Sequence, residues 1–204
     1  IVWAALAVCS ASSSWAAGIW TTGNASMNEN VLFGHSTCAG CVDGPATTVI
    51  GHGQTTNILV DFSNVTNLVT SGANTVTYDP LNQTPGFTAL TIFAPGYAIT
   101  GIMFQLTEIS TVTDGNVALT ANLLGGGTSV GNFSLLHQGG GLNQFNWTTN
   151  AGTSASSIGI SSTLALHDIS QVSITLQAVP EPATFGMVGA GLAALAVTGR
   201  GMRR

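Results

Sequence analysis

The sequence has no lysine, and its only three basic residues are arginines at the extreme C-terminus: Arg200, Arg203 and Arg204. The formal net charge of the whole chain is −5, so the part ahead of the arginines is more acidic still. Proteins that bind nucleic acid neutralise phosphates with clustered Lys and Arg side chains. We therefore expect no nucleic-acid partner, and mechanisms that need a lysine are excluded.

Charged residues are also scarce, at 5% of the chain against about a quarter in typical soluble domains. Long stretches rich in Glu, Lys, Gln and Ala are absent, which argues against surface helices. Thr, Ser, Asn and Gly dominate the polar positions instead, and short runs of β-forming residues recur between turn residues. These runs are 57–62, 75–78, 88–93, 99–109, 117–124, 132–137, 143–149, 157–160 and 171–178.

Residues 17–179 are enough for one domain with a proper core. Regular short strands with turn signals predict an all-β fold, a single antiparallel β-sandwich of the jelly-roll kind. We expect Asp114-Gly115-Asn116 to form a hairpin turn between two of the strands. Phe145 and Trp147 alternate on one face of a run, as core residues do. Trp20 lies outside any clear strand.

Signatures of catalysis are missing as well. No Gly-x-Ser-x-Gly elbow occurs, and the glycine runs 125–127 and 139–141 lack a phosphate-binding lysine, so turns are the better interpretation. A glycosidase needs two carboxylates that face each other across a cleft. The carboxylates ahead of residue 180 are widely spaced: Glu29, Asp43, Asp61, Asp79, Glu108, Asp114 and Asp168. We expect no enzyme, and hydrolysis of a matrix polymer is the least favoured alternative.

Cysteine is rare, with three residues in the chain, of which Cys38 and Cys41 lie close together. With His35 and His52 they supply the residue types of a tetrahedral zinc site, although the spacing is not that of a zinc finger. In an exported protein thiols pair, so we expect a Cys38–Cys41 disulfide that closes a tight loop. Metal binding, a redox dithiol and unpaired thiols stay open as alternatives. No other metal or cofactor is expected, apart from a weak calcium interpretation.

That interpretation rests on Asp114 and Asn116, whose side chains suit a loop-bound calcium ion, although no EF-hand-like ladder surrounds them. A glycan-binding sandwich, by contrast, stacks sugars on exposed aromatic rings. Tyr97, in Pro95-Gly96-Tyr97, is the best loop candidate for such a contact. These residues carry the alternative function, a module that binds exopolysaccharide, with calcium as an aid.

The N-terminal segment predicts export. An apolar run at 1–8 is followed by small residues, and Ser14 and Ala16 suit the −3 and −1 positions of a signal-peptide cleavage site. We interpret residues 1–16 as a signal-peptide remnant. The stretch before Cys9 is reminiscent of a lipoprotein box, but Val8 is too large for the position ahead of the cysteine.

The C-terminal segment predicts membrane retention. Residues 183–198 carry no charge and as a helix would span about 24 Å at about 1.5 Å per residue. That is shorter than the roughly 30 Å hydrocarbon core, a gap that bilayer thinning or snorkelling arginines can cover. We expect a transmembrane helix, with a buried core helix as the alternative. The arginines beyond it place the C-terminus in the cytoplasm and the body on the other side.

The sequence Val-Pro-Glu-Pro-Ala-Thr at 179–184, the short apolar run and the arginine cluster together resemble the PEP-CTERM sorting signal of exported Gram-negative bacterial proteins. The resemblance implies that a membrane-embedded exosortase recognises Pro180, Glu181 and Pro182 and processes the tail, residues 180–204. An unprocessed tail anchor is the alternative. The body also loosely resembles those of such proteins at 87–92, 101–106, 114–115, 141–145 and 168–172.

Both ends therefore favour one location and one role. We expect a protein that crosses the inner membrane, is transiently membrane-anchored, and then resides at the cell surface or outside the cell. Its expected function is a non-catalytic component of the surface or the extracellular polysaccharide matrix. Exosortase is the expected partner, and exopolysaccharide a further one.

Overall fold

The computed structural model describes residues 18–34, 38–81, 86–109, 113–137, 143–150 and 152–179. The signal-peptide remnant predicted at 1–16 lies outside the described residues. So does the whole sorting segment, with the helix predicted at 183–198, the three arginines and Pro180, Glu181 and Pro182. Within the described ranges, no helix has the length and apolar character needed to cross a membrane.

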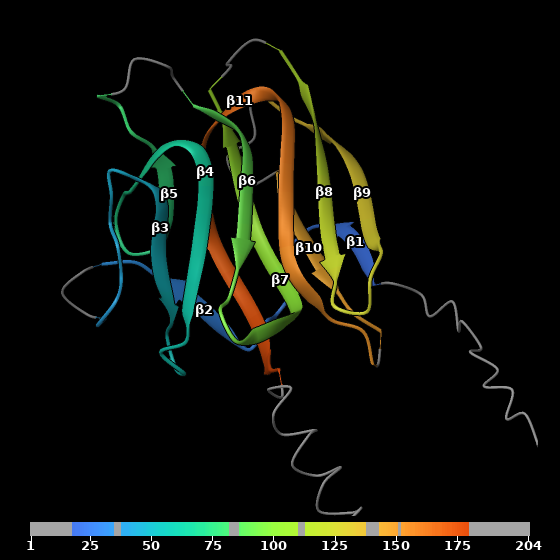
Figure 1. Cartoon of the computed structure of the whole chain (residues 1–204). Coiled ribbons are helices and arrows are strands. Elements are labelled where there is room, and N and C mark those ends of the chain that lie inside the picture. The colour runs from blue at the N-terminus through green and yellow to red at the C-terminus, as the bar shows by residue number, and fades with distance from the viewer. Residues whose placement is uncertain are drawn as a thin grey trace, which may run out of the picture.

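The described chain is built of strands, and the prediction of an all-β antiparallel fold is confirmed (Figure 1). The strands are β1 (Ile19–Thr22), β2 (Glu29–Leu32), β3 (Ala46–Gly53), β4 (Leu59–Thr70), β5 (Thr75–Tyr78), β6 (Phe87–Phe93), β7 (Tyr97–Glu108), β8 (Gly115–Leu123), β9 (Thr128–Leu135), β10 (Gln144–Thr148) and β11 (Ala155–Ala178).

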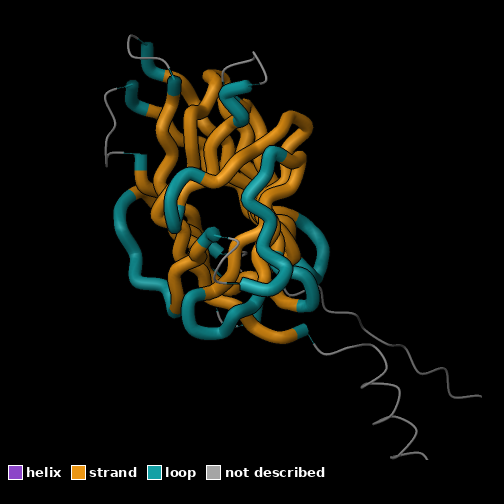
Figure 2. Tube along the Cα trace, turned by 90° about the vertical axis from the view of Figure 1, so that its left-hand side faces the viewer, coloured by secondary structure: helices purple, strands orange, loops and turns teal. Residues whose placement is uncertain are grey.

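One long strand organises this arrangement. β11 has 24 residues; its first half pairs with β6 and β8, and its second half with β7, β2 and β5. The front layer in Figure 1 contains β9, β8, the first half of β11, β6 and β4. The back layer contains β1, β10, β7, the second half of β11 and β2. On one side β3, β4 and β5 connect the layers, because β3 pairs with β2 and β4, and β5 pairs with β4 and β11. This side faces the viewer in Figure 2.

The core lies between the layers and follows the two-residue period of a strand. In β7, Ile102, Phe104 and Leu106 point inward and are fully buried, while Met103 lies on the opposite face of the same strand. At the other strands, the largest fully buried side chains include Phe62, Phe145 and Trp147. The core position predicted for Phe145 and Trp147 is confirmed.

The prediction of a hairpin at Asp114-Gly115-Asn116 is wrong. The strands on either side, β7 and β8, do not pair with each other but each pairs with β11, in different layers. The connection therefore crosses from the back layer to the front layer, and Gly115 already belongs to β8. A Cβ at Gly115 would lie 2.8 Å from the side chain of Leu164, so glycine permits the close packing of β8 on β11.

The number of strands differs from the prediction in two places. Trp20, expected outside a strand, lies in β1 and is buried, and its indole nitrogen Nε1 donates to the carbonyl oxygen of Ser129 at 3.1 Å. The runs predicted at 157–160 and 171–178 are parts of one strand, β11. Its register shifts between Ser170 and Ser173, where Gln171 has a positive φ of 52°. This irregularity is a bulge that bends the strand without ending it.

Candidate functional site

The end of β11 is the place where the folded body meets the segment that resembles a sorting signal. Gln177 and Ala178 still pair with Ala98 and Tyr97 of β7. One residue further, the backbone N–H of Val179 donates to the carbonyl oxygen of Gly96 at 3.1 Å. The next residue is Pro180. The body is therefore held by strand hydrogen bonds up to the residue before the Pro-Glu-Pro sequence, at the lower end of β11 in Figure 1.

A hollow of about 340 Å³ lies beside this exit. It is formed by the last residues of β11, the start of β7 and the turns that follow β8 and β10. Its lining includes Ala98, Thr100, Leu124, Thr149, Thr153 and Gln177. None of its lining residues is charged, so it offers no acid or base for catalysis. Its chemistry is limited to hydrogen bonds and apolar contact.

The loop position predicted for Tyr97 is wrong. Tyr97 is the first residue of β7, and its side chain is half-buried against the core. The turn before it uses Gly96 at a positive φ of 77°, and the N–H of Tyr97 donates to the carbonyl oxygen of Ala94. Tyr97 therefore lies beside the end of β11, and its ring is not exposed for stacking on a sugar.

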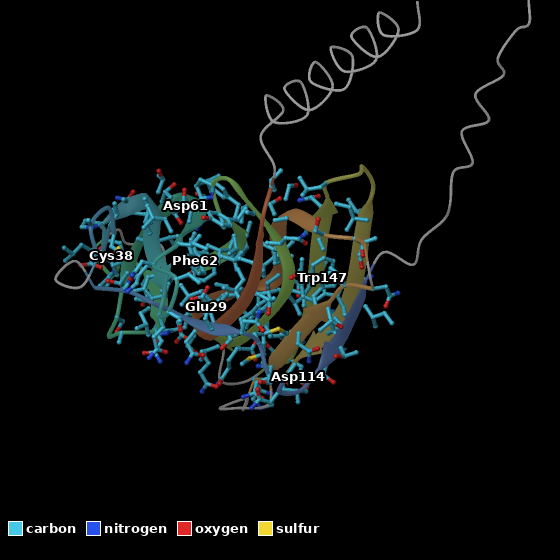
Figure 3. All side chains as sticks on the ribbon, turned by 90° about the horizontal axis from the view of Figure 1, so that it is seen from below. Glu29, Cys38, Asp61, Phe62, Asp114 and Trp147 are labelled. Carbon is cyan, nitrogen blue, oxygen red and sulfur yellow. A yellow bond between two sulfur atoms is a disulfide. The ribbon has the colours of Figure 1, made fainter. Side chains whose placement is uncertain are left out.

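The disulfide predicted between Cys38 and Cys41 is confirmed, with the two Cα atoms 5.5 Å apart. It closes the Ala39-Gly40 turn at the edge of the sandwich opposite Trp147 (Figure 3). His52 is buried beside it, with Nδ1 3.4 Å from Sγ of Cys41. The ligand atoms of these three residues lie within 4.8 Å of one another, but the two sulfurs are joined as a disulfide. His35, the fourth residue of the zinc interpretation, lies outside the described residues.

The hydrogen bonds of Asp114 and Asn116 in the structure are made to protein groups. The Oδ1 atom of Asp114 lies 2.6 Å from Nδ1 of His137 and accepts the backbone N–H of the same residue at 3.0 Å. These hydrogen bonds hold the pKa of Asp114 below its usual value. Asn116 lies in β8, where its backbone N–H donates to Oγ1 of Thr163. The calcium interpretation stays a prediction. Sequence reasoning missed the Asp114–His137 pair because its members are 23 residues apart.

Glu108 is a second carboxylate at this end of the sandwich. It continues the inward-facing row of β7, is 8% exposed, and neither carboxylate oxygen has a hydrogen-bond partner among the described residues. Burial raises its pKa, the negative charge of Asp114 adds to the rise, and His137 opposes it. Glu108 therefore binds a proton more tightly in the folded protein than in the unfolded chain.

This arrangement makes Glu108→Leu a stabilising substitution with a defined pH dependence. Since the pKa of Glu108 is higher in the folded protein than its ordinary value of 4.5, the contribution of Glu108 to stability is greatest below that value and falls as pH rises through the folded pKa. Leucine removes the unpartnered buried carboxyl group. We expect the free energy of unfolding at neutral pH to rise by roughly 1–3 kcal/mol.

Urea unfolding at acidic and neutral pH measures this effect. The gain should shrink toward acidic pH, because the wild-type carboxyl group is then neutral. Asp61, whose pKa burial also raises, is common to both proteins and cancels in the comparison. A variant that is less stable than the wild type at both pH values would contradict the expectation.

Glu29 is a site residue that sequence reasoning did not single out. Its Oε2 accepts the backbone N–H groups of Thr55 and Thr56 at 3.2 and 3.1 Å, and its Oε1 accepts the hydroxyl of Thr56 at 2.8 Å. The carboxylate thus holds the turn between β3 and β4 against β2. Its role in this structure is to fix the chain rather than to act on a ligand.

Comparison with known proteins concerns the segment that begins at the exit of β11. The family model of the PEP-CTERM protein-sorting motif matches residues 178–204. Neither the curated proteins nor the solved structures give a match. The matched segment starts at the last residue of β11, so sorting segment and folded body are contiguous.

Proposed function

We propose that this chain, which carries a PEP-CTERM protein-sorting motif, serves without catalytic activity at the cell surface or in the extracellular polysaccharide matrix. The motif itself implies export and processing by exosortase. The role after export, the absence of activity and transient anchoring by residues 183–198 are the proposed parts. In this proposal Pro180, Glu181 and Pro182 are recognised, and Arg200, Arg203 and Arg204 hold the tail at the cytoplasmic face.

The observation that carries the proposal is the direct passage from β11 into the motif. A strand that is hydrogen-bonded through Val179 delivers an extended backbone to Pro180. Each of the two prolines fixes its own φ, and each disfavours helix at the residue before it. The recognition sequence would therefore be presented as an extended strip at the surface of a folded body. An enzyme that acts on extended peptide segments needs such a strip.

The described carboxylates support a role without catalysis. Glu29 is bound to the β3–β4 turn, Glu108 is buried, and Asp114 is engaged with His137. A hydrolase of the glycosidase type uses an acid and a second carboxylate on opposite sides of a substrate cleft. The hollows at the exit of β11 and on the back layer have no carboxylate in their linings.

The test is a double substitution in the motif, Glu181→Ala with Pro182→Ala, expressed in a host that has an exosortase. We expect the variant to keep its full C-terminal tail and to accumulate in the membrane fraction, while the wild type is shortened and leaves it. Mass spectrometry of the C-terminus and cell fractionation give the readout. The matched control is Thr88→Ala, an exposed position of β6, which should be processed like the wild type. Identical size and location of the double variant and the wild type would refute processing.

Binding of exopolysaccharide is the second candidate function. Stacking of sugars on exposed aromatic rings has no support in the described body. Trp20 and Trp147 are buried, and Tyr78 and Tyr97 pack against the core. A groove of uncharged side chains on the back layer supports it instead.

A further inference from the structure

Two adjoining hollows form a groove on the back layer. Their volumes are about 460 and 240 Å³, and they share Asn30 of β2, Met103 of β7 and Ser173 of β11. In β7 and β11, the residues next to these positions, Ile102 and Ile174, are fully buried in the core. The side chains of Met103 and Ser173 therefore lie on the outer face of the layer, and the groove runs across three neighbouring strands.

The lining of the groove has a consistent chemistry. The floor is the thioether side chain of Met103, which is 7% exposed. The walls carry amides and hydroxyls, and no lining residue is charged: Asn24, Ser26, Asn30, Asn74, Gln171 and Ser173. Because amides and hydroxyls both donate and accept hydrogen bonds, the walls suit a ligand with many hydroxyl groups.

Part of the lining is already fixed in position. The hydroxyl of Ser173 donates to Oδ1 of Asn30 at 2.6 Å, which orients the amide. With Oδ1 engaged, the Asn30 amide nitrogen is directed away from Ser173, toward Oε1 of Gln54 at 3.4 Å. A preorganised wall of this kind lowers the entropy lost when a ligand binds.

Gln171 is the conformational outlier of this surface. It lines the smaller hollow, has a positive φ of 52°, and forms the bulge between Ser170 and Ser173. A positive φ is uncommon for a residue with a long side chain, and such outliers cluster at binding sites. Bulges are likewise frequent beside sites, where they re-aim a side chain. Here the bulge places the amide of Gln171 at the groove, where Nε2 of Gln144 approaches its Oε1 at 3.5 Å.

An unpartnered acceptor lies next to this bulge. Gln105 is two residues from Met103 on the same face of β7 and pairs in register with Ser170 and Gln144. It is 8% exposed, and its Oε1 has no hydrogen-bond partner among the described residues. Gln105 lines neither hollow and its Oε1 is buried, so it lies behind the groove wall rather than in it.

We propose that this groove binds a chain of uncharged sugars, a neutral glycan. Amide and hydroxyl walls match the sugar hydroxyls, the Met103 side chain gives the C–H face of a ring an apolar contact, and the lining offers no charge to pair with an ionic ligand. The site deepens the second candidate function and rests on the proposed export for access to a matrix glycan. Its occupant is recognised at Gln171 and Asn74, rather than at Tyr97.

Calorimetric titration of the full chain in mild detergent tests the site. The probes are the neutral hexasaccharides of β-1,4-glucan, α-1,4-glucan, β-1,3-glucan and β-1,4-mannan, with an oligogalacturonate as the anionic comparison. We expect saturable binding of at least one neutral probe, with an affinity that changes little when sodium chloride is raised. The anionic probe should bind more weakly than that neutral probe.

Two substitutions assign the binding to the groove. Gln171→Gly removes the side chain but keeps a residue that adopts positive φ readily, so the fold should be retained or stabilised. Asn74→Ala removes an exposed amide from the other side of the hollow. Each variant should weaken binding by about tenfold, the effect of about one lost hydrogen bond to a ligand. The control is Asn132→Ala, an exposed amide on β9 of the front layer, which should bind like the wild type.

Three results would overturn the proposal: no binding of any neutral probe, binding that both groove variants retain in full, or preferential binding of the anionic probe. The outcome is independent of sorting. A chain that is processed by exosortase but binds no neutral glycan refutes only the groove, whereas binding by a chain that escapes processing refutes only the sorting proposal.

Discussion

Replacing Trp147 by alanine is expected to lower the free energy of unfolding by about 3–5 kcal/mol, the usual cost of truncating a buried large aromatic residue. Trp147 is fully buried in β10 and lies 6.2 Å from the ring of Trp20, measured between centroids. Its Nε1 donates to the hydroxyl of Ser129 at 3.4 Å. Trp147 therefore fills the core, and its hydrogen bond to Ser129 links β10 of the back layer to β9 of the front layer.

Loss of this side chain leaves a cavity beneath β1 as well. A Cβ at Gly18 would lie 2.7 Å from the Trp147 ring, which shows how closely the chain entering β1 packs on it. Small domains are stable by only about 5–15 kcal/mol, so the expected loss is a large fraction of the total. The midpoint and slope of urea unfolding measure the change.

Trp147→Phe serves as the matched variant. It keeps an aromatic ring but loses the hydrogen bond to Ser129, whose hydroxyl still donates to the carbonyl oxygen of Gly18. We expect a loss of about 1–2 kcal/mol from the smaller volume and the lost hydrogen bond. If Trp147→Ala lowers the free energy of unfolding no more than Trp147→Phe does, the buried position of Trp147 in the structure would be wrong.

The second large effect is expected for Glu29→Ala, with a loss of about 2–3 kcal/mol, because hydrogen bonds to a charged group contribute about 1.5–3 kcal/mol each and the turn is partly open to water. The substitution removes the acceptor of three hydrogen bonds from Thr55 and Thr56. Since the carboxylate is 8% exposed and a Cβ at Gly53 would overlap it, no other group can take its place without movement of the turn.

Hydrogen exchange of the amides of Thr55 and Thr56 is the sensitive readout, together with urea unfolding. Glu29→Gln keeps one acceptor oxygen but loses the charge and the second acceptor, so its exchange rates should fall between those of the wild type and the alanine variant. If exchange at both amides is unchanged in Glu29→Ala, the turn between β3 and β4 is stable without the carboxylate, and the role assigned to Glu29 is wrong.

The strands that the sequence predicts well are those whose apolar and polar residues alternate regularly. β5, β6, β7, β8 and β10 agree closely with the expected runs, and β5 has the predicted bounds, 75–78. β1 and β2 have only four residues each, and β3 ends in Gly51, His52 and Gly53, so neither length nor alternation distinguishes them. A hairpin was predicted at Gly115 because local turn chemistry does not show that two consecutive strands belong to different layers.

The same distinction applies to the sites. The sorting motif and the Cys38–Cys41 pair are contiguous in sequence, and both were predicted. The contacts of Asp114 with His137 and of Glu29 with Thr56 join residues more than 20 positions apart, and the groove gathers side chains from β2, β7 and β11. Such assemblies depend on strand order and register, which a single sequence does not provide.

β11 continues into the sorting segment without a linker, and near its end it is flanked on one side by β7 and on the other by β2. A pull applied through the tail would act along this strand, in shear against its neighbours. Several ladder hydrogen bonds would then have to break together rather than one after another. In the proposed membrane-anchored state, the protein would thus be suspended by this strand, and the attachment would resist drag.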